Sequence, residues 1–437
     1  MATYLTRTPS STGNRDKWTF STWLKRSKLG ATNCFFSGND GSNSLDAKFR
    51  NDDVIEVYNY LGGGYGAQLK TNRVFRDTSA WYHIVIVYDS GNSTEAHRLR
   101  IYVNGEEESS FSTTNYPSLN EDSIINASGV PMDVGRQQNG SDFFLGYLAD
   151  TILADGQAYA PNTFGETDSA TGEWKPKSIS GVTFGTNGFH LKYANAGAMG
   201  TDSSGNNNTL TVNSAGTNPS TTDTPSNNFA TWNSLVVRSF QYPLALTEGN
   251  LKVIADSNAS FGSTVAAIVS LDKGKWYWEF KYTTSGTGGY VVGWGEDTYD
   301  FDYQSDAYPY KASLGSTSGV FYRADGGKIV NGTETGSAGA SWSQNDVIGV
   351  AVDLDNGNIT FYKNGSSQFS ETSVFTSTLS YYPEFYGYGS KGGQANFGNP
   401  SYTIASGNAD ANGHGNFEYA VPSGYFALCT KNINQYG

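Results

Sequence analysis

The sequence WYHIVIVYDSGNSTEAHRLRIYVNG at residues 81–105 has a counterpart in DVIGVAVDLDNGNITFYKNG at residues 346–365. Each stretch starts with a run of β-branched residues that ends at an Asp, passes through a polar turn, and continues as an alternating strand. Asn and Gly tolerate positive φ and mark turns between antiparallel strands, here at Asn104-Gly105, Asn356-Gly357 and Asn364-Gly365. The pattern predicts an all-β chain with two antiparallel, jelly-roll-like β-sandwich domains in tandem.

Length and composition favour short strands over helices. The chain has 437 residues, of which 52 are Gly and 14% are aromatic, a composition typical of strands joined by tight turns. A single hydrophobic core rarely grows past about 250 residues, so the length indicates two or three domains. Large aromatic side chains bury about 150–250 Å² each, so Trp, Phe and Tyr can fill such cores with few residues.

Alternating segments place the domains along the chain. WTFSTWL begins at Trp18 and KWYWEFKY spans residues 275–282, and in both every second residue shares one face, as in a strand. We expect four parts: a first sandwich over 1–198, a polar connecting segment over 199–234, a second sandwich over 235–404, and a C-terminal tail over 405–437. The connecting segment is either a free linker or laid against the sandwiches, and Phe229 and Trp232 favour the second.

Charge and hydropathy argue against several classes of partner. The net charge is −13, and Lys and Arg do not cluster, whereas binding to nucleic-acid phosphates needs such clusters. No apolar run approaches about 18 residues, so we expect no membrane insertion. Cys34 and Cys429 are the only cysteines, which excludes a disulfide framework, and the N-terminus shows no secretory signal.

Several phrases of the sequence resemble known families. The first half is similar to a concanavalin-like sandwich of the laminin-G type in WTFSTWLKR, WYHIVIVYD and RLRIYVNGE. The second half resembles the SPRY domain, through the more specific motifs GKWYWEF, VVGWGE, DVIGVAVDLDNGNITFYKNG, YPEFYGY and NFG. Further phrases resemble bacteriophage tail-fibre-like and other virion proteins. These phrases are FFLGYLADTILADGQAYAPNTFGETDSATGEWKPKSISG, GTNGFHLKY, DSSGNNN, DTPSNNFATWN and VPSGYFALCTKN.

The resemblance implies a virion component, such as a tail fibre, a spike or a surface decoration. Such a protein assembles in the host cytoplasm, which agrees with the missing secretory signal and the few cysteines. The implied partners are other virion proteins and further copies of the chain, because phage appendages are commonly trimeric. No coiled-coil heptads in the sequence specify three chains.

A tyrosine-rich segment, EDTYDFDYQSDAYPYKASLG at residues 296–315, is the best candidate for a binding site. Its aromatic residues are Tyr299, Phe301, Tyr303, Tyr308 and Tyr310. Aromatic faces stack on sugar rings or on apolar partner surfaces, and Tyr adds a hydroxyl for hydrogen bonding. The SPRY resemblance implies binding through loops at one end of the sandwich. Alternatively, these tyrosines pack beneath the loop or against a neighbouring subunit.

No residue pattern indicates catalysis. Concanavalin-like glucanases pair two carboxylates about 5–5.5 Å apart in the retaining mechanism, and the nearest match to their Glu-x-Asp-x-x-Glu motif is Glu166-Thr-Asp168-Ser-Ala-Thr171, which lacks the third acid. The histidines lack metal-ligand spacing, and His83 lies within a predicted strand as a packed side chain. We therefore predict no enzyme and no catalytic residue.

Calcium is the one metal that the sequence suggests. Laminin-G-like modules can hold Ca²⁺ with Asp side chains and backbone carbonyls, and acidic side chains are dense at Asp40, Asp46, Asp52 and Asp53. Asp in loops between strands also bonds its own backbone and forms turns. We adopt the turn interpretation, and predict neither a metal site nor a cofactor.

The sequence thus predicts a non-enzymatic virion protein, either a tail-fibre-like or another surface-exposed component, that recognises a host-surface glycan. Two alternatives remain open. One is a purely architectural protein that decorates the capsid or joins tail components, and the other is a polysaccharide-degrading enzyme.

Overall fold

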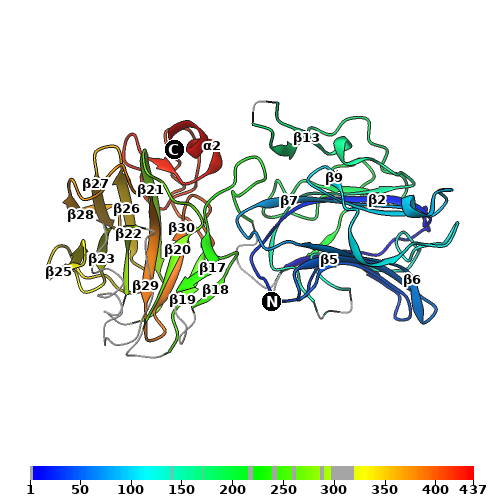
Figure 1. The fold of residues 1–437 in the computed structure, drawn as a ribbon, viewed down its shortest axis with the longest axis horizontal. Helices are drawn as coiled ribbons and strands as arrows, with labels where there is room; N and C mark the ends of the chain where they lie inside the picture. Colours follow the sequence, from blue (N-terminus) through cyan, green and yellow to red (C-terminus); the bar gives the residue numbers. More distant parts are fainter. Residues whose placement is uncertain are drawn as a thin grey trace. The chain divides into compact units, whose positions relative to one another are not determined.

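The computed structural model describes residues 3–138, 140, 142–169, 171–214, 220–238, 244–257, 262–285, 290–296 and 319–437. The chain divides into two compact units, Met1–Ser220 and Thr221–Gly437. Each unit is built from antiparallel sheets that face each other across a hydrophobic core (Figure 1). The predicted all-β class with two β-sandwich domains is therefore confirmed.

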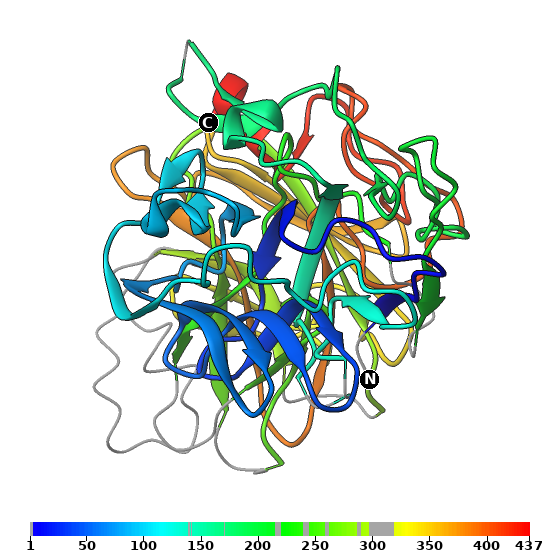
Figure 2. The same cartoon turned by 90° about the vertical axis from the view of Figure 1, so that its right-hand side faces the viewer.

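Two main sheets form the first unit, and Figure 2 shows their strands from a second direction. Sheet A contains, in order, β10 (Phe111–Asn115), β6 (Gly64–Val74), β5 (Val54–Leu61), β4 (Ser44–Phe49), β3 (Asn33–Asn39), β11 (Met132–Val134), β1 (Tyr4–Arg7) and β16 (Thr211–Asn213). Sheet B contains β15 (Phe189–Leu191), β12 (Gly146–Asp155), β2 (Lys17–Arg26), β7 (Trp81–Asp89), β8 (Leu99–Val103) and β9 (Glu106–Glu107). Outside them lie the hairpin β13 (Gly165–Thr167) and β14 (Trp174–Pro176), and the 3-10 turns η1 (Glu95–His97) and η2 (Pro161–Thr163).

Aromatic side chains join the two layers of the first unit. Trp18 and Phe20 point inward from β2 and are fully buried. The Trp18 ring stacks on Tyr88 at 5.4 Å between centroids, and the Phe20 ring stacks on Phe36 at 4.1 Å. The period-two alternation that the sequence shows from Trp18 onward is thus the alternation between core and outer face.

Two further sheets form the second unit. Sheet C contains β17 (Trp232–Arg238), β20 (Ser263–Ala267), β29 (Tyr381–Gly387), β22 (Tyr290–Glu296), β23 (Gly319–Arg323), β24 (Lys328–Val330) and β25 (Thr333–Thr335). Sheet D contains β18 (Ala245–Thr247), β19 (Lys252–Ile254), β30 (Gly392–Asn396), β21 (Lys275–Tyr282), β26 (Val347–Asp353), β27 (Asn358–Lys363) and β28 (Ser366–Glu371), with β31 (Phe426–Ala427) paired to β21. The helix α2 (Thr430–Tyr436) follows, and no helix in the described ranges is long and apolar enough to cross a membrane.

The second core is also aromatic. Trp276, Trp278 and Phe280 point inward from β21 and are fully buried. The Trp278 ring packs on Phe397 at 5.4 Å between centroids, and the Phe280 ring stacks on Phe385 at 5.1 Å. The alternation predicted for KWYWEFKY separates the side chains that enter this core from Tyr277 and Glu279, which are buried on the opposite face of the sheet.

The repeated Asn-Gly turns have the same structural role in both units. Asn104 and Asn364 have positive φ, at 52° and 49°. Each turn joins paired strands, β8 to β9 and β27 to β28. The Asn104 amide oxygen accepts the backbone N–H of His83 at 2.8 Å, and the Asn364 amide oxygen accepts that of Val347 at 2.9 Å. Each Asn therefore also fastens its turn to the strand that precedes the hairpin.

A matching ion pair lies at the turn end of the β7–β8 hairpin and of the β26–β27 hairpin. Lys17 opens β2 opposite Asp89, with 3.3 Å between ammonium and carboxylate, and Lys275 opens β21 opposite Asp353 at 2.9 Å. The shared pattern in the sequence thus corresponds to one three-strand arrangement used twice.

The described part of the polar stretch 199–234 divides between the units. Residues 211–213 form β16, which pairs with β1 in sheet A. Phe229 and Trp232 are buried in the second unit. Phe229 lies in a small cluster with Tyr277 of β21 and with Phe417 and Cys429 of the C-terminal tail. The tail thus covers the outer face of sheet D.

A buried carboxyl group anchors this tail. Glu279 lies in the middle of β21 and is fully buried. It accepts the backbone N–H groups of Glu418 and Tyr419 at 2.9 and 2.8 Å, and it also accepts hydrogen bonds from Tyr277 and Asn396 at 3.1 Å each. No described residue gives it an ion pair. A buried carboxylate without a cation is costly, so burial raises the pKa of Glu279 to about 7.

This raised pKa makes the second unit sensitive to pH. The pKa rises from 4.5 to about 7 on folding, so the stabilisation is complete below the unfolded value and is lost as the pH rises through the folded value. We expect Glu279 to lower the free energy of unfolding by about 3 kcal/mol between about pH 5 and about pH 8. Urea unfolding of the wild type and Glu279→Gln measures this, since the amide does not titrate. An equal pH dependence in the two proteins contradicts the assignment.

Candidate functional site

The predicted tyrosine-rich site lies outside the described residues. Tyr299, Phe301, Tyr303, Tyr308 and Tyr310 all fall between Glu296 and Gly319, the ends of β22 and β23. The two flanking strands are antiparallel neighbours in sheet C, with Gly295 opposite Gly319. The tyrosine segment therefore stays a prediction.

A second group of tyrosines lies on the outer face of sheet A. In β5, Ile55 and Val57 point into the core, so Glu56, Tyr58 and Tyr60 point outward. The same alternation on β4 and β6 brings further polar side chains beside them. We call this surface the tyrosine–polar face; its members are Asp46, Lys48, Arg50, Asp52, Glu56, Tyr58, Tyr60, Tyr65, Gln68 and Lys70.

Three tyrosines form one end of the tyrosine–polar face. Tyr65 follows the β5–β6 turn, where Gly62 and Gly63 adopt positive φ of 57° and 89°. Its ring meets those of Tyr58 and Tyr60 edge to face, each at 5.4 Å between centroids. Tyr65 is 52% exposed, and no other aromatic side chain in the described ranges is as open to solvent. An open aromatic ring is therefore held in a fixed position by its neighbours.

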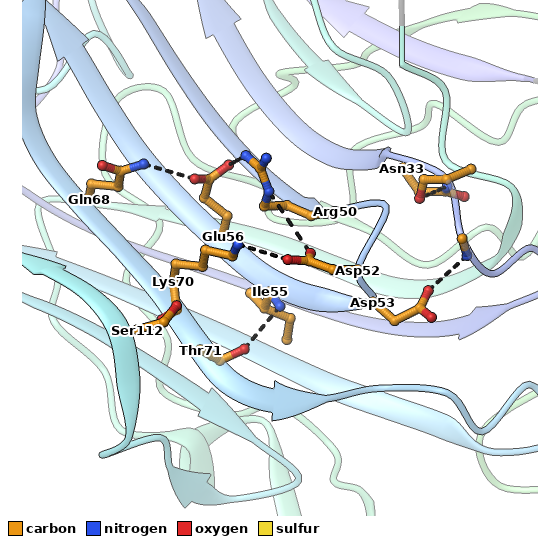
Figure 3. Close-up of polar contacts among 12 residues, drawn as sticks. Asn33, Arg50, Asp52, Asp53, Ile55, Glu56, Gln68, Lys70, Thr71 and Ser112 are labelled. Atoms are coloured by element: carbon orange, nitrogen blue, oxygen red, sulfur yellow. Dashed lines mark hydrogen bonds and ion pairs between the residues drawn. The ribbon is translucent and has the colours of Figure 1, made fainter.

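Paired charges form the other end, and Figure 3 shows Arg50, Asp52, Glu56 and Lys70 close together. Glu56 accepts hydrogen bonds from Arg50 and Gln68 at 2.8 Å each. Lys70 donates to Asp52 at 2.8 Å, and this bond lowers the pKa of Asp52. The side chain of Glu56 is only 3% exposed, whereas that of Arg50 is 38% exposed. The buried acid thus holds the more exposed donor in place.

Asp46 likewise holds hydrogen-bond donors in place beside the tyrosines. Its carboxylate accepts hydrogen bonds from the Tyr58 hydroxyl, from Gln137 at 2.6 Å and from Lys48 at 3.4 Å. Burial, together with the Asp46 charge, raises the pKa of Tyr58 well above its ordinary value of 10.0. Tyr58 therefore stays protonated and keeps its ring orientation.

The geometry of the tyrosine–polar face suits recognition of a polyhydroxylated ligand. An aromatic ring offers a stacking surface, and hydrogen-bonding groups of fixed direction lie on the neighbouring strands. This face was not among the sites predicted from the sequence, although its local pattern is visible there. The signal was the alternation IEVYNY at residues 55–60, in which every second residue is polar or a tyrosine.

The glucanase-like acids lie on the β13–β14 hairpin. Glu166 lies in β13, and Asp168 receives the backbone N–H of Thr171 at 3.1 Å. Lys175 of β14 lies 2.8 Å from the Asp168 carboxylate and 3.8 Å from that of Glu166. Both acids are therefore engaged with one lysine, on a hairpin outside sheets A and B.

His83 is fully buried between aromatic rings. It stacks on Trp23 at 4.6 Å and on Trp174 at 6.0 Å between centroids. Trp174 donates its indole N–H to His83 Nδ1 at 3.0 Å, and Ser21 lies 2.8 Å from Nε2. Burial lowers the pKa of His83 to about 3, so the ring is neutral.

This hydrogen-bonding pattern fixes the tautomer of His83. An indole N–H only donates, so Nδ1 accepts and the ring proton sits on Nε2, where it donates to the Ser21 hydroxyl. A histidine that activates a serine needs a free lone pair at that nitrogen. In this tautomer Nε2 has no lone pair to offer Ser21. The hydrogen bond from Trp174 to His83 holds the β13–β14 hairpin on sheet B.

The four aspartates considered for calcium are each engaged by other groups. Asp40 accepts the backbone N–H groups of Ser42 and Asn43 at 2.9 and 2.7 Å, as in a turn. Asp46 and Asp52 belong to the tyrosine–polar face. Burial opposes ionisation of Asp53, but hydrogen bonds from Gly30 and two arginines outweigh it and lower its pKa. In the part of the chain that the structure describes, no group of three His, Cys, Asp or Glu residues could hold a metal ion.

Comparison with known families agrees with the two folds. Residues 2–157 match the concanavalin A-like lectin/glucanases superfamily, in its laminin G form, and residues 275–400 match the SPRY domain. The chain therefore contains a concanavalin A-like lectin/glucanase domain followed by a SPRY domain. No curated protein matches the sequence.

Solved structures with similar folds include two SPRY domains and a pentraxin. The SPRY domain of human HERC1 is 20% identical, with a TM-score of 0.29 over 38% of this chain and 94% of that chain. The TRIM65 PSpry domain is 17% identical, with a TM-score of 0.29 over 38% and 92%. A heptameric SAP-like pentraxin from Limulus polyphemus is 16% identical, with a TM-score of 0.28 over 36% and 72%.

Trp174 provides a test of the tautomer assignment. Trp174→Phe keeps a ring in the slot but leaves His83 Nδ1 buried without a donor, which we expect to lower the free energy of unfolding by about 1–2 kcal/mol. Protease cleavage within residues 165–176 should also become faster. Urea unfolding and timed proteolysis measure both effects, with Glu173→Gln on the exposed turn as the control. Unchanged stability of Trp174→Phe would show that the indole N–H does not fix the ring.

Proposed function

We propose that this chain, in which a concanavalin A-like lectin/glucanase domain precedes a SPRY domain, is a non-enzymatic binding protein. Its ligand is a host-surface glycan, and its place is the surface of a phage virion, as a tail-fibre-like or other exposed component. The tyrosine–polar face of the first unit is the site that we assign to the glycan.

The observation that carries this proposal is the position of Tyr65. An aromatic ring that is 52% exposed lies against two other tyrosines, and the side chain of Gln68 projects from the same strand of the same face. Sugar rings present apolar C–H faces and a rim of hydroxyls, so a stacking ring beside oriented hydrogen-bonding groups matches their chemistry. Because buried acids already hold the polar groups, binding orders few side chains.

Two observations favour binding over hydrolysis. Glu166 and Asp168 share one lysine on an outer hairpin, and His83 presents a protonated nitrogen to Ser21. Neither arrangement supplies the free acid and base that glycosidic hydrolysis requires.

Support for the virion comes from the phage-like connecting phrases of the sequence, such as DTPSNNFATWN and VPSGYFALCTKN. The proposed partners are other virion proteins and further copies of this chain. The tyrosine segment at 299–310 is proposed as a second contact, with either a ligand or a neighbouring subunit. In the architectural alternative, the chain joins virion components and binds no glycan.

Glycan binding is tested by removing the exposed ring. We expect the purified protein to bind host cells and a subset of glycans on an array, and Tyr65→Ala to weaken that binding about tenfold or more. Leu119→Ala is the matched control, because Leu119 is 55% exposed and lies outside the tyrosine–polar face. Absence of binding to both cells and array would favour the architectural alternative.

The non-enzymatic assignment has a separate test. We expect the wild type to release no reducing sugar or oligosaccharide from host-envelope polysaccharide, even after prolonged incubation at high protein concentration. Glu166→Gln should behave identically, because Glu166 is engaged with Lys175 on the hairpin. Cleavage by the wild type that is lost in Glu166→Gln would establish the hydrolase alternative.

A further inference from the structure

We infer that the tyrosine–polar face selects neutral oligosaccharides and discriminates against glycans that carry carboxylate, sulfate or phosphate groups. This inference rests on the proposed function, and it names the class of ligand for that site. It follows from how the charges of the face are paired.

The cations and acids of the tyrosine–polar face are equal in number. The cations are Lys48, Arg50 and Lys70, and the acids are Asp46, Asp52 and Glu56. Each cation is committed to an acid: Lys48 to Asp46 at 3.4 Å, Arg50 to Glu56 at 2.8 Å, and Lys70 to Asp52 at 2.8 Å. An anionic ligand group would therefore find no unpaired positive charge among these residues.

Burial makes the pairs hard to open. Side-chain exposure is 1% for Asp46 and 3% for Glu56. If Arg50 turned to an anionic sugar, Glu56 would keep its charge in a buried position with only Gln68 as a donor. An uncompensated buried carboxylate is strongly unfavourable, so Arg50 keeps its partner and offers only its remaining N–H groups to a ligand.

Asp52 repels anionic ligand groups at the exposed edge of the tyrosine–polar face. Its side chain is 47% exposed and sits 4.0 Å from Arg50 as well as 2.8 Å from Lys70. An anionic group that approaches either cation also approaches this exposed carboxylate. Neutral hydroxyls meet no such penalty, because they accept from the cations and donate to the acids.

The shape of the face fits a chain of sugars more than a single ring. Tyr60 and Glu56 are four residues apart on β5, which at about 3.3 Å per residue separates the aromatic end from the charged end by about 13 Å. A sugar stacked on Tyr65 therefore leaves room for a neighbouring sugar over Gln68 and Arg50. Discrimination against anions acts on that neighbouring sugar.

The test compares matched glycans on the full-length protein by calorimetry. The probes are the best neutral oligosaccharide from the array and the same backbone carrying a sulfate or a uronic-acid carboxylate. We expect the wild type to bind the neutral form about tenfold more tightly than either anionic form at physiological salt. Asp52→Asn frees Lys70 and should improve binding of the anionic forms about fivefold relative to the neutral form.

Asp122→Asn is the control. Asp122 is also an exposed acid in an ion pair, 3.2 Å from Arg15, and its substitution changes the net charge equally but off the face. This substitution should leave the binding affinity for both classes of ligand unchanged, which separates a local effect from a change in overall charge.

The outcomes separate the inference from the function beneath it. Equal or tighter binding of the anionic forms, abolished by Tyr65→Ala, would overturn the selectivity and leave glycan recognition standing. Failure of Asp52→Asn to improve anionic binding would also overturn it, because the paired charges would then not be the cause. If neither class binds the wild type, the proposed function falls and the selectivity falls with it.

Discussion

Aromatic packing between two antiparallel sheets holds each unit together, and the outer surfaces depend on it. In the first unit Trp18 and Phe20 of β2 are fully buried, and in the second Trp276 and Trp278 of β21 take equivalent roles. Large rings bury much area per residue, so a Gly-rich chain with few long aliphatic side chains still builds two cores. Once alternate residues face inward, the intervening residues must form an outer face.

The two units use those outer faces differently. On the tyrosine–polar face of sheet A most of the outward residues are charged or aromatic, and Glu56 is neutralised by Arg50, which directly follows β4. On sheet D the outward Glu279 is covered by the chain's own tail, whose backbone N–H groups it accepts. An outer face can thus be completed either by paired side chains or by backbone from elsewhere in the chain. The first solution leaves a surface open to a ligand, whereas the second closes it.

The buried polar groups of this protein mostly fix geometry. His83 is neutral and accepts the indole N–H of Trp174, so it fastens the β13–β14 hairpin. Asp46 and Glu56 are buried beneath more exposed donors and set their directions. Preorganisation of this kind lowers the entropic cost of binding, which is why a face made of satisfied hydrogen bonds is compatible with recognition. A catalytic site would instead need an acid with a proton to donate and a base with a free lone pair.

Local sequence was sufficient for the fold class, the repeated hairpin and the strands that begin near Trp18 and at Lys275. Alternation with period two and Asn-Gly turns act over a few residues, so WTFSTWL, KWYWEFKY and the repeated hairpin could be interpreted without knowing their neighbours. The resemblance to laminin-G-type and SPRY sandwiches was readable for the same reason, since its motifs are short strands.

The candidate site was not readable in this way. Tyr58 and Glu56 stand on one strand, but Asp46, Arg50 and Lys70 come from other parts of the chain, and their pairing depends on the register of β4, β5 and β6. The tautomer of His83 likewise depends on Trp174, which lies 91 positions further along the chain. The sequence by itself determined which residues alternate and where the chain turns, because those are local preferences. Only the tertiary structure decided which charges neutralise each other and which aromatic ring stays exposed, because that depends on the pairing register of β4, β5 and β6 and on side-chain packing.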